Sequence, residues 1–257
     1  CNLIMKTIIL AGGLGTRISE YTERIPKPML PVGNKPLIWH IMETYANHGH
    51  KDFIVALGYK AQVVKEYFLN YRALNNNFTI NLSSGKIIEH STNTFNWDVT
   101  LVDTGLQTMT GGRLKKLDNM IEGNTFLLTY GDGVSNVDIN KVIDFHNSHS
   151  KMVTITAVRP IARFGELDIA NDYKIRSFEE KPQLARGWIN GGYMVINKEF
   201  LNLIHSDNEM LEREPISRAV ELDEVCAYKH RGFWQCVDNK RDYETIQKLY
   251  KEGPPWL

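Results

Sequence analysis

Short apolar segments alternate with amphipathic ones through the first two thirds of the chain. Apolar runs rich in β-branched residues predict strands near 6–10, 52–57, 125–130 and 153–158. Patterns typical of helices lie near 36–48, 60–71 and 138–149. This alternation predicts an α/β fold: a Rossmann-like, mostly parallel sheet with helices on both faces.

Residues 75–98 interrupt the alternation. They are rich in Asn and Ser and contain Phe78, Phe95 and Trp97. A connection of this length is unusual within a compact domain. Two interpretations stay open: a hairpin that packs on a neighbouring subunit, or a surface loop.

The remainder of the chain predicts a smaller β-rich region over 164–200. Residues 210–252 return to helices, with one short strand pair near 224–237.

We expect one domain over 5–257. Residues 5–160 would form mainly its core, and 161–257 mainly the β-rich region and a C-terminal helical part. Residues 1–4 precede Met5, which fits as a start residue, and we expect them to be an upstream remnant.

Composition narrows the class of protein. The chain has 257 residues, of which 42% are hydrophobic, so it is long and apolar enough for a substantial core. Its 30 basic and 30 acidic residues cancel, whereas a nucleic-acid binder usually shows a basic excess. No apolar run is long enough to cross a membrane and no signal peptide is visible. The three cysteines lack C-x-x-C spacing, which favours a reducing cytoplasm and argues against a zinc site.

The first predicted strand leads directly into a glycine-rich segment. Residues 10–17 read L-A-G-G-L-G-T-R. A strand that ends in glycines exposes backbone N–H groups at its carboxyl edge, and such groups bind anions. Arg17 and Lys27, the latter between Pro26 and Pro28, add two positive charges. The segment therefore predicts a site for a polyphosphate.

Two standard phosphate-binding motifs are absent. Walker A requires G-x-x-x-x-G-K-[ST], but the one Gly-Lys pair, Gly85-Lys86, continues with Ile87. The dinucleotide fingerprint G-x-G-x-x-G/A also fails, because its third required position counted from Gly13 falls on Ile18. A dinucleotide-dependent oxidoreductase is therefore disfavoured.

Further motifs follow in order along the chain. They are V-D-T-G at 102–105, T-G-G-R at 110–113, Y-G-D-G at 130–133, R-F-G at 163–165, F-E-E-K-P at 178–182, W-I-N-G-G-Y at 188–193 and G-F-W-Q at 232–235. With L-A-G-G-L-G-T-R and P-K-P-M at 26–29, this set resembles the sugar-phosphate nucleotidylyltransferases, from about residue 5 to residue 256. The T-G-G-R and W-I-N-G-G-Y motifs point to the branch of that family that uses CTP.

The resemblance implies an enzyme that joins CTP to glucose 1-phosphate, gives CDP-glucose and releases pyrophosphate. The sugar phosphate is already ionised at neutral pH, so the enzyme needs no nucleophile of its own. Positioning, cations and Mg²⁺ should supply most of the catalysis. The same reaction with UTP, dTTP or another sugar 1-phosphate stays open, as does a non-catalytic protein that binds a nucleotide sugar.

The expected catalytic residues are Arg17, Lys27, Asp132, Lys181 and Asp238. A guanidinium can hold pyrophosphate oxygens bidentately. Both aspartates are expected to bind Mg²⁺, which prefers one or two carboxylates together with substrate phosphates and waters. The alternatives are a turn aspartate for Asp132 and a helix N-cap for Asp238.

The resemblance implies that residues 5–160 are mainly a nucleotide-binding core and 161–257 mainly a sugar-binding and C-terminal helical part. It also assigns the other site residues to the two substrates. The residues expected to bind the nucleotide are Leu10, Ala11, Gly12, Gly13, Gly15, Thr16, Arg17, Lys27, Thr108, Thr110, Gly111, Gly112, Arg113 and Gly131. The backbone of a glycine loop at 110–113 would read the cytosine edge, with Arg113 donating to O2. Those expected to bind the sugar phosphate are Glu180, Lys181, Asn190, Gly191, Gly192 and Tyr193. The resemblance also implies a homo-oligomer, with a hexamer as the expected form.

Overall fold

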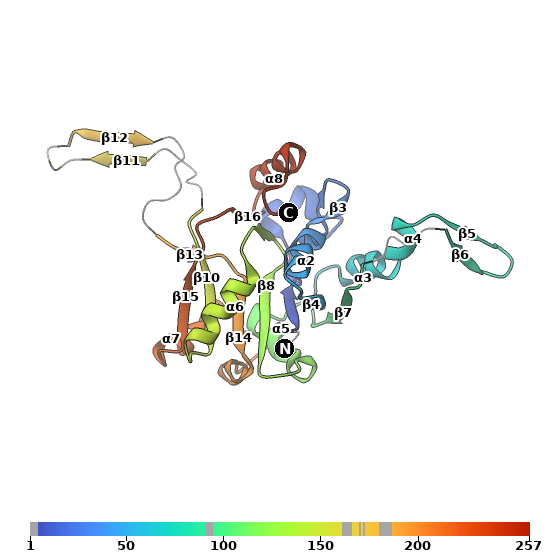
Figure 1. The fold of residues 1–257 in the computed structure, drawn as a ribbon, viewed down its shortest axis with the longest axis horizontal. Helices are drawn as coiled ribbons and strands as arrows, with labels where there is room; N and C mark the ends of the chain where they lie inside the picture. Colours follow the sequence, from blue (N-terminus) through green and yellow to red (C-terminus); the bar gives the residue numbers. More distant parts are fainter. Residues whose placement is uncertain (1–4, 91–94, 161–165, 170, 172, 180–186) are drawn as a thin grey trace.

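The computed structural model describes residues 5–90, 95–160, 166–169, 171, 173–179 and 187–257. They form a sheet-centred body from which two hairpins project on opposite sides (Figure 1). Glu180, Lys181 and the R-F-G motif at 163–165 lie outside the described residues.

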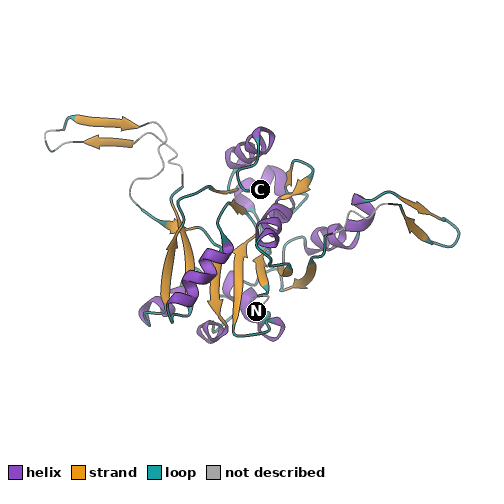
Figure 2. Cartoon of the chain, viewed as in Figure 1, coloured by secondary structure: helices purple, strands orange, loops and turns teal. Residues whose placement is uncertain are grey.

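One eight-stranded sheet forms the centre of the body (Figure 2). Its strands follow the order β13 (Ile189–Asn190), β10 (Val153–Val158), β14 (Met194–Asn197), β8 (Thr125–Tyr130), β1 (Thr7–Leu10), β4 (Asp52–Leu57) and β7 (Asp98–Asp103), with β15 (Val225–Lys229) beside β10. Strands β8, β1, β4 and β7 run parallel, whereas β14 is antiparallel to both β8 and β10. The predicted α/β fold with a mostly parallel sheet is confirmed.

Both faces of the sheet are buried, and alternate strand residues serve opposite faces. Ile9 belongs to one hydrophobic cluster with residues of α2 (Leu37–Asn47), α3 (Ala61–Leu69), α6 (Ile139–Ser148) and α8 (Lys240–Glu252). Ile8 and Leu10 belong to the other, with residues of α5 (Thr110–Lys116) and α7 (Glu214–Glu221). The central strands β1, β4 and β8 are therefore apolar almost throughout, since both of their faces are covered.

Shorter elements connect these layers. They are η1 (Thr16–Ile18), α1 (Ser19–Thr22), η2 (Lys27–Met29), β2 (Pro31–Val32), β3 (Lys35–Pro36), α4 (Tyr71–Asn75), η3 (Asp118–Met120), β9 (Gly133–Ser135), β11 (Glu166–Ile169), β12 (Ile175–Glu179), η4 (Lys198–Leu203) and β16 (Trp234–Cys236). The prediction that the strands near 224–237 pair with each other is wrong. β15 joins β10 in parallel, and β16 pairs with β9. Pairing with β10 gives β15 the hydrogen-bond partners of a large sheet, although its residues are half-buried or exposed, whereas an isolated two-stranded hairpin is only marginally stable.

Residues 75–98 contain the hairpin that one of the two interpretations predicted. Strands β5 (Phe78–Ile80) and β6 (Ile87–Glu89) pair antiparallel and extend away from the body beyond α4 (Figure 1). Ile80 lies opposite Ile87, and both are exposed.

Across the part of the chain that the structure describes, the helices are too short or too polar for a membrane span.

Candidate active site

The glycine-rich segment lies at the carboxyl edge of the sheet, where β1 and β8 end side by side. Leu10 pairs with Tyr130, and the Gly131 N–H donates to the Leu10 carbonyl at 3.0 Å. A Cβ at Gly131 would lie 2.9 Å from Cγ of Pro28, so glycine is needed for this close approach. Gly12-Gly13 and Gly131-Asp132, each following a parallel strand, therefore lie at the same edge of the sheet and line one cleft.

The phosphate loop, residues 11–16, turns into η1 at Gly15. Gly15 has φ 64°, a left-handed conformation that glycine adopts without strain. The Thr22 hydroxyl donates to the Gly15 carbonyl at 2.9 Å and fixes the end of the loop. Gly13 has no neighbouring atom within 4 Å of the position of a Cβ, so that side of the loop is open. Arg17 lies in η1, and its side chain lies outside the described part of the structure.

Lys27 connects two carboxylates that are far apart in the sequence. Its Nζ lies 3.2 Å from Oδ2 of Asp132, which follows β8, and 3.2 Å from Oδ1 of Asp238, which follows β16. Only 13% of the Lys27 side chain is exposed, against about a third of each carboxylate. Asp238 is not the cap of α8, because Asn239 occupies that position and accepts from the Asp242 N–H.

The electrostatics of this group reflect its burial. Burial alone would lower the pKa of Lys27, but the charges of Asp132 and Asp238 outweigh it and raise the pKa. Burial raises the pKa of Asp132, more than the charge of Lys27 lowers it, and Asp238 adds to the increase. Two carboxylates beside one lysine leave a net negative charge, so a further cation would be attracted to this site.

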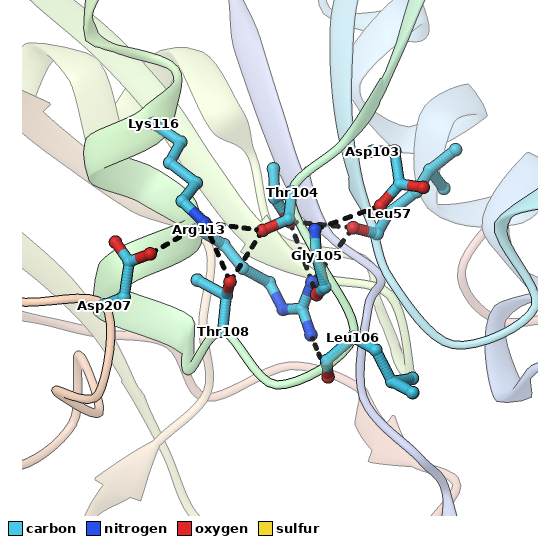
Figure 3. A network of polar contacts seen from close by, with 9 residues as sticks. All are labelled: Leu57, Asp103, Thr104, Gly105, Leu106, Thr108, Arg113, Lys116 and Asp207. Carbon is cyan, nitrogen blue, oxygen red and sulfur yellow. Dashed lines mark hydrogen bonds and ion pairs between the residues drawn. The ribbon is translucent and has the colours of Figure 1, made fainter.

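Arg113 is buried and joins three segments of the nucleotide side (Figure 3). Its Nη1 donates to the carbonyls of Leu57 and Gly105 and to the Thr104 hydroxyl, at 2.7–2.9 Å. Its Nη2 donates to the carbonyls of Gly12 and Leu106 at 3.0 and 3.3 Å. Arg113 was expected to donate to cytosine O2, but in this structure both terminal nitrogens are occupied by protein oxygens.

Close packing around this guanidinium explains two glycines. A Cβ at Gly12 would lie 2.3 Å from Cζ of Arg113, and one at Gly58 would lie 2.4 Å from its Nη1. Burial lowers the pKa of Arg113, and the charge of Asp103 partly offsets this. A guanidinium remains charged even so, so it orients the carbonyls that surround it.

The T-G-G-R segment was expected to be a glycine loop and instead forms the first turn of α5. Its glycines allow the segment 207–211 to approach. A Cβ at Gly111 would lie 2.8 Å from the Glu209 carbonyl, and one at Gly112 would lie 2.5 Å from Cα of Asp207. The Gly111 N–H donates to the same Glu209 carbonyl at 3.0 Å. Backbone packing therefore requires these glycines irrespective of any base.

Two clefts meet at the end of β8. The first, of about 370 Å³, is lined by most of the predicted nucleotide-binding residues: Leu10, Ala11, Gly12, Gly13, Gly15, Thr16, Lys27, Thr108, Thr110, Arg113 and Gly131. The second, of about 320 Å³, is lined by Asn190, Gly191, Asp238 and Cys236 among others. Tyr130 and Asp132 line both. A larger cleft, of about 540 Å³, lies between α2 and the base of the β5–β6 hairpin and contains none of these residues.

The second cleft contains only part of the predicted sugar-side set. Asn190 and Gly191 line it, and a Cβ at Gly192 would lie 3.1 Å from the Tyr130 ring. Tyr193 lies in the core instead, where its ring stacks on Tyr45 and its hydroxyl donates to the Gly133 carbonyl at 3.0 Å. It supports the cleft from within the core.

Two polar residues of the second cleft, Trp234 and Glu212, are among those that sequence reasoning missed. Trp234 lines it and donates from Nε1 to the Gly191 carbonyl at 2.9 Å. Its G-F-W-Q motif was visible, although no role followed from it. Glu212 also lines the cleft. It lies in a polar surface segment whose pattern gave no signal.

Comparison with known proteins identifies the family of this chain. The family model described as nucleotidyl transferase matches residues 6–253. The chain therefore belongs to the nucleotidyl transferase family.

Two curated relatives match over nearly their full length. A protein of Salmonella typhimurium named glucose-1-phosphate cytidylyltransferase is 46% identical over 254 residues, which are 98% of each chain. One of Bacillus subtilis named probable glucose-1-phosphate cytidylyltransferase is 37% identical over 97% of each. Among solved structures, HddC from Yersinia pseudotuberculosis matches with a TM-score of 0.69 and 25% identity, over 96% of this chain and 99% of that one. A second structure of HddC is described as complexed with GMP-PN.

Proposed function

We propose that this nucleotidyltransferase transfers the cytidylyl group of CTP to glucose 1-phosphate, with CDP-glucose and pyrophosphate as products. An oxygen of the sugar phosphate forms a bond to the α-phosphorus, and the bond from that phosphorus to the β-phosphate oxygen breaks. The observation that carries the proposal is the position of Lys27, Asp132 and Asp238 where two clefts meet. The names of the 46% and 37% identical relatives support the choice of both substrates.

The nucleotide would occupy the first cleft. Its phosphates would lie along residues 11–16, whose backbone N–H groups and open Gly13 suit an anion. Lys27 would neutralise charge on the α-phosphate or the leaving pyrophosphate, and we assign Arg17 to the β- and γ-phosphates. Arg113 fixes the Gly12 carbonyl, and through it the loop, whether or not it also meets the base.

The sugar phosphate would occupy the second cleft, beside Asn190 and Gly191. We assign Glu180 and Lys181 to the sugar hydroxyls and the phosphate. The reacting oxygen would then face the α-phosphate near Asp132, which lines both clefts. Holding two anions in this orientation is the main task of the site.

Asp132 and Asp238 fit a magnesium ion. One oxygen of each carboxylate lies 3.2 Å from Nζ of Lys27, so the two carboxylates are close together. Among the described residues, no group of three or more His, Cys, Asp or Glu could form a complete protein-only metal site. Mg²⁺ prefers this arrangement, because it takes one or two carboxylates and completes its shell with phosphates and waters. Such an ion would stabilise the negative charge that develops on the leaving pyrophosphate.

We further propose that the protein forms a homo-oligomer through the β5–β6 hairpin. Phe78, Ile80 and Ile87 lie on one face of the hairpin and are 39%, 44% and 52% exposed. An isolated hairpin is only marginally stable, and its exposed apolar face would be stabilised by packing against another subunit. Cys226 and Cys236 are both free thiols, which supports action in the reducing cytoplasm.

Pyrophosphate release with glucose 1-phosphate and Mg²⁺ tests the function, with CTP, UTP, dTTP, ATP and GTP supplied separately. We expect release with CTP alone. Release with another nucleotide would keep the reaction class and discard the cytidylyl assignment. No release with any of them would favour another sugar phosphate or a non-catalytic protein, and nucleotide calorimetry would separate those two.

A further inference from the structure

Glu212 lies between the two clefts. It lines the second cleft, whereas Met210, two residues earlier, lines the first, and Leu211 between them is completely buried. The buried Leu211 anchors the segment, so that the carboxylate of Glu212 is presented to the second cleft from a fixed backbone.

Hydroxyl groups from two other elements lie beside this carboxylate. Thr110, the first residue of α5, donates from its hydroxyl to Oε2 of Glu212 at 2.8 Å. That hydroxyl accepts from the Leu211 N–H, also at 2.8 Å. The Tyr130 phenol lies close to Glu212: burial, and after it the charge of Glu212, raise the pKa of Tyr130. The Asn190 side-chain amide donates to the Tyr130 hydroxyl at 3.4 Å. Thr110 belongs to the nucleotide side and Asn190 to the sugar side, so Glu212 links the two.

Among the residues that the structure describes, no basic side chain neutralises the charge of Glu212. No lysine or arginine in the described part of the chain forms an ion pair with it, and the groups beside it there are hydroxyls. A carboxylate offers about four acceptor positions, and the hydrogen bond from Thr110 leaves about three of them, one on the side of Tyr130. A negative charge would repel the phosphate of a sugar phosphate, so the ligand groups it suits are neutral donors.

We propose that Glu212 accepts hydrogen bonds from hydroxyl groups of the hexose and thereby selects the sugar, an inference that rests on the proposed function. Its charge keeps the phosphate end away and orients the ring with its hydroxyls toward α5 and its phosphate toward Lys27. The link through Thr110 keeps this acceptor in position relative to the nucleotide cleft.

The test compares Glu212→Gln and Glu212→Ala with wild-type enzyme on glucose 1-phosphate and its 2-, 3-, 4- and 6-deoxy analogues. The wild type should discriminate against at least one analogue by about 10- to 100-fold in kcat/KM, the contribution of a hydrogen bond to a charged group. Glu212→Ala should abolish that discrimination at the same hydroxyl, and it should raise KM for glucose 1-phosphate but not for CTP. Glu214→Gln, an exposed carboxylate in the first turn of α7, is the matched control.

Three results would overturn the inference. A purely structural role would lower activity equally with every analogue. A role toward the nucleotide would appear as lost discrimination between CTP and 2′-deoxy-CTP. An unchanged KM of Glu212→Ala for glucose 1-phosphate would show that Glu212 does not contact the sugar. If Glu212→Ala does not fold, the same comparison of deoxy analogues is made with Glu212→Gln, because this variant retains the size of the side chain.

Failure of the proposed function gives a different result. The wild type would then release no pyrophosphate from CTP and glucose 1-phosphate. Calorimetric titration of wild-type and Glu212→Ala protein with glucose 1-phosphate and its deoxy analogues would still test the contact. Equal binding by both proteins, or no binding by either, would overturn it.

Discussion

Arg113 donates a hydrogen bond of 3.0 Å to the carbonyl oxygen of Gly12, although 101 residues separate them in the sequence. The bond joins α5 to the phosphate loop. It is possible only because Gly12 has no side chain, since a Cβ there would lie 2.3 Å from Cζ of Arg113. The conformation of the loop and the position of α5 are therefore set together.

The first prediction separates two adjacent glycines. Gly12→Ala should lower the free energy of unfolding by about 2 kcal/mol, because the added methyl must displace a tightly held guanidinium. Gly13→Ala should leave stability nearly unchanged, since no atom lies within 4 Å of the added Cβ. Urea denaturation of the two variants gives the comparison. Equal loss of stability in both would contradict the role of Arg113.

Gly13→Ala also tests the position of the nucleotide. If phosphates lie against this open side of the loop, the added methyl should weaken CTP binding although the fold is intact. Calorimetric titration with CTP measures this. Wild-type affinity would mean that the phosphates bind elsewhere.

The second prediction concerns Lys27 and Asp132. Lys27→Met and Asp132→Asn should each lower kcat by about 10²–10³-fold, as the loss of a group that stabilises developing charge does. Both substitutions nearly preserve side-chain size, so circular dichroism should show a normal fold. Lys151→Met is the matched control, because Lys151 forms a 2.7 Å ion pair with Asp223 outside both clefts. Near-wild-type turnover by the first two variants would rule out the assigned site.

The third prediction concerns pH and the segment that carries Glu212. Arg218 holds Glu209 through two hydrogen bonds of 2.8 and 2.9 Å, and the hydrogen bonds from Arg218 and from the His205 N–H lower the pKa of Glu209 to about 2. Because its ordinary value is 4.5, the unfolded chain binds the proton more readily than the folded protein. The stabilisation is complete above pH 4.5 and is lost as the pH falls toward 2.

Glu209→Gln isolates this contribution. The variant should be less stable than the wild type at pH 6, and the difference between them should narrow progressively below pH 4.5. Urea midpoints at several pH values measure it, and all other titrating groups are shared by the two proteins. A difference that stays constant from pH 6 to pH 2.5 would show that Glu209 titrates normally.

The fourth prediction concerns the β5–β6 hairpin. Ile80→Asp combined with Ile87→Ser removes the apolar face of one cross-strand pair and should lower the mass of the protein in solution. Ser84→Asp, at the exposed turn of the same hairpin, adds the same charge without removing apolar surface and should leave the mass unchanged. Light scattering after size-exclusion chromatography measures both. An unaltered mass in the double variant would exclude the hairpin from any assembly.

Local patterns in the sequence determined the positions of the main strands and of the glycine-rich segment. The strands at 7–10, 52–57, 125–130 and 153–158 were predictable, because a strand buried on both faces must be apolar throughout. The position of the glycine-rich segment was predictable as well, since it directly follows the first apolar strand. The pairing of β1 with β8 then brought Gly12-Gly13 and Gly131-Asp132 together, as their positions at strand ends implied.

Tertiary structure alone decided how the motifs are used. Gly111 and Gly112 suggested a loop around a base, but they let residues 207–211 pack against α5, and no local pattern encodes which distant segment will approach. β15 and β16 lie close in sequence yet pair with different strands. Glu212 reaches the second cleft because Leu211 is anchored in the core. Periodicity records which face of an element is buried, whereas contacts between distant segments depend on the whole packed chain.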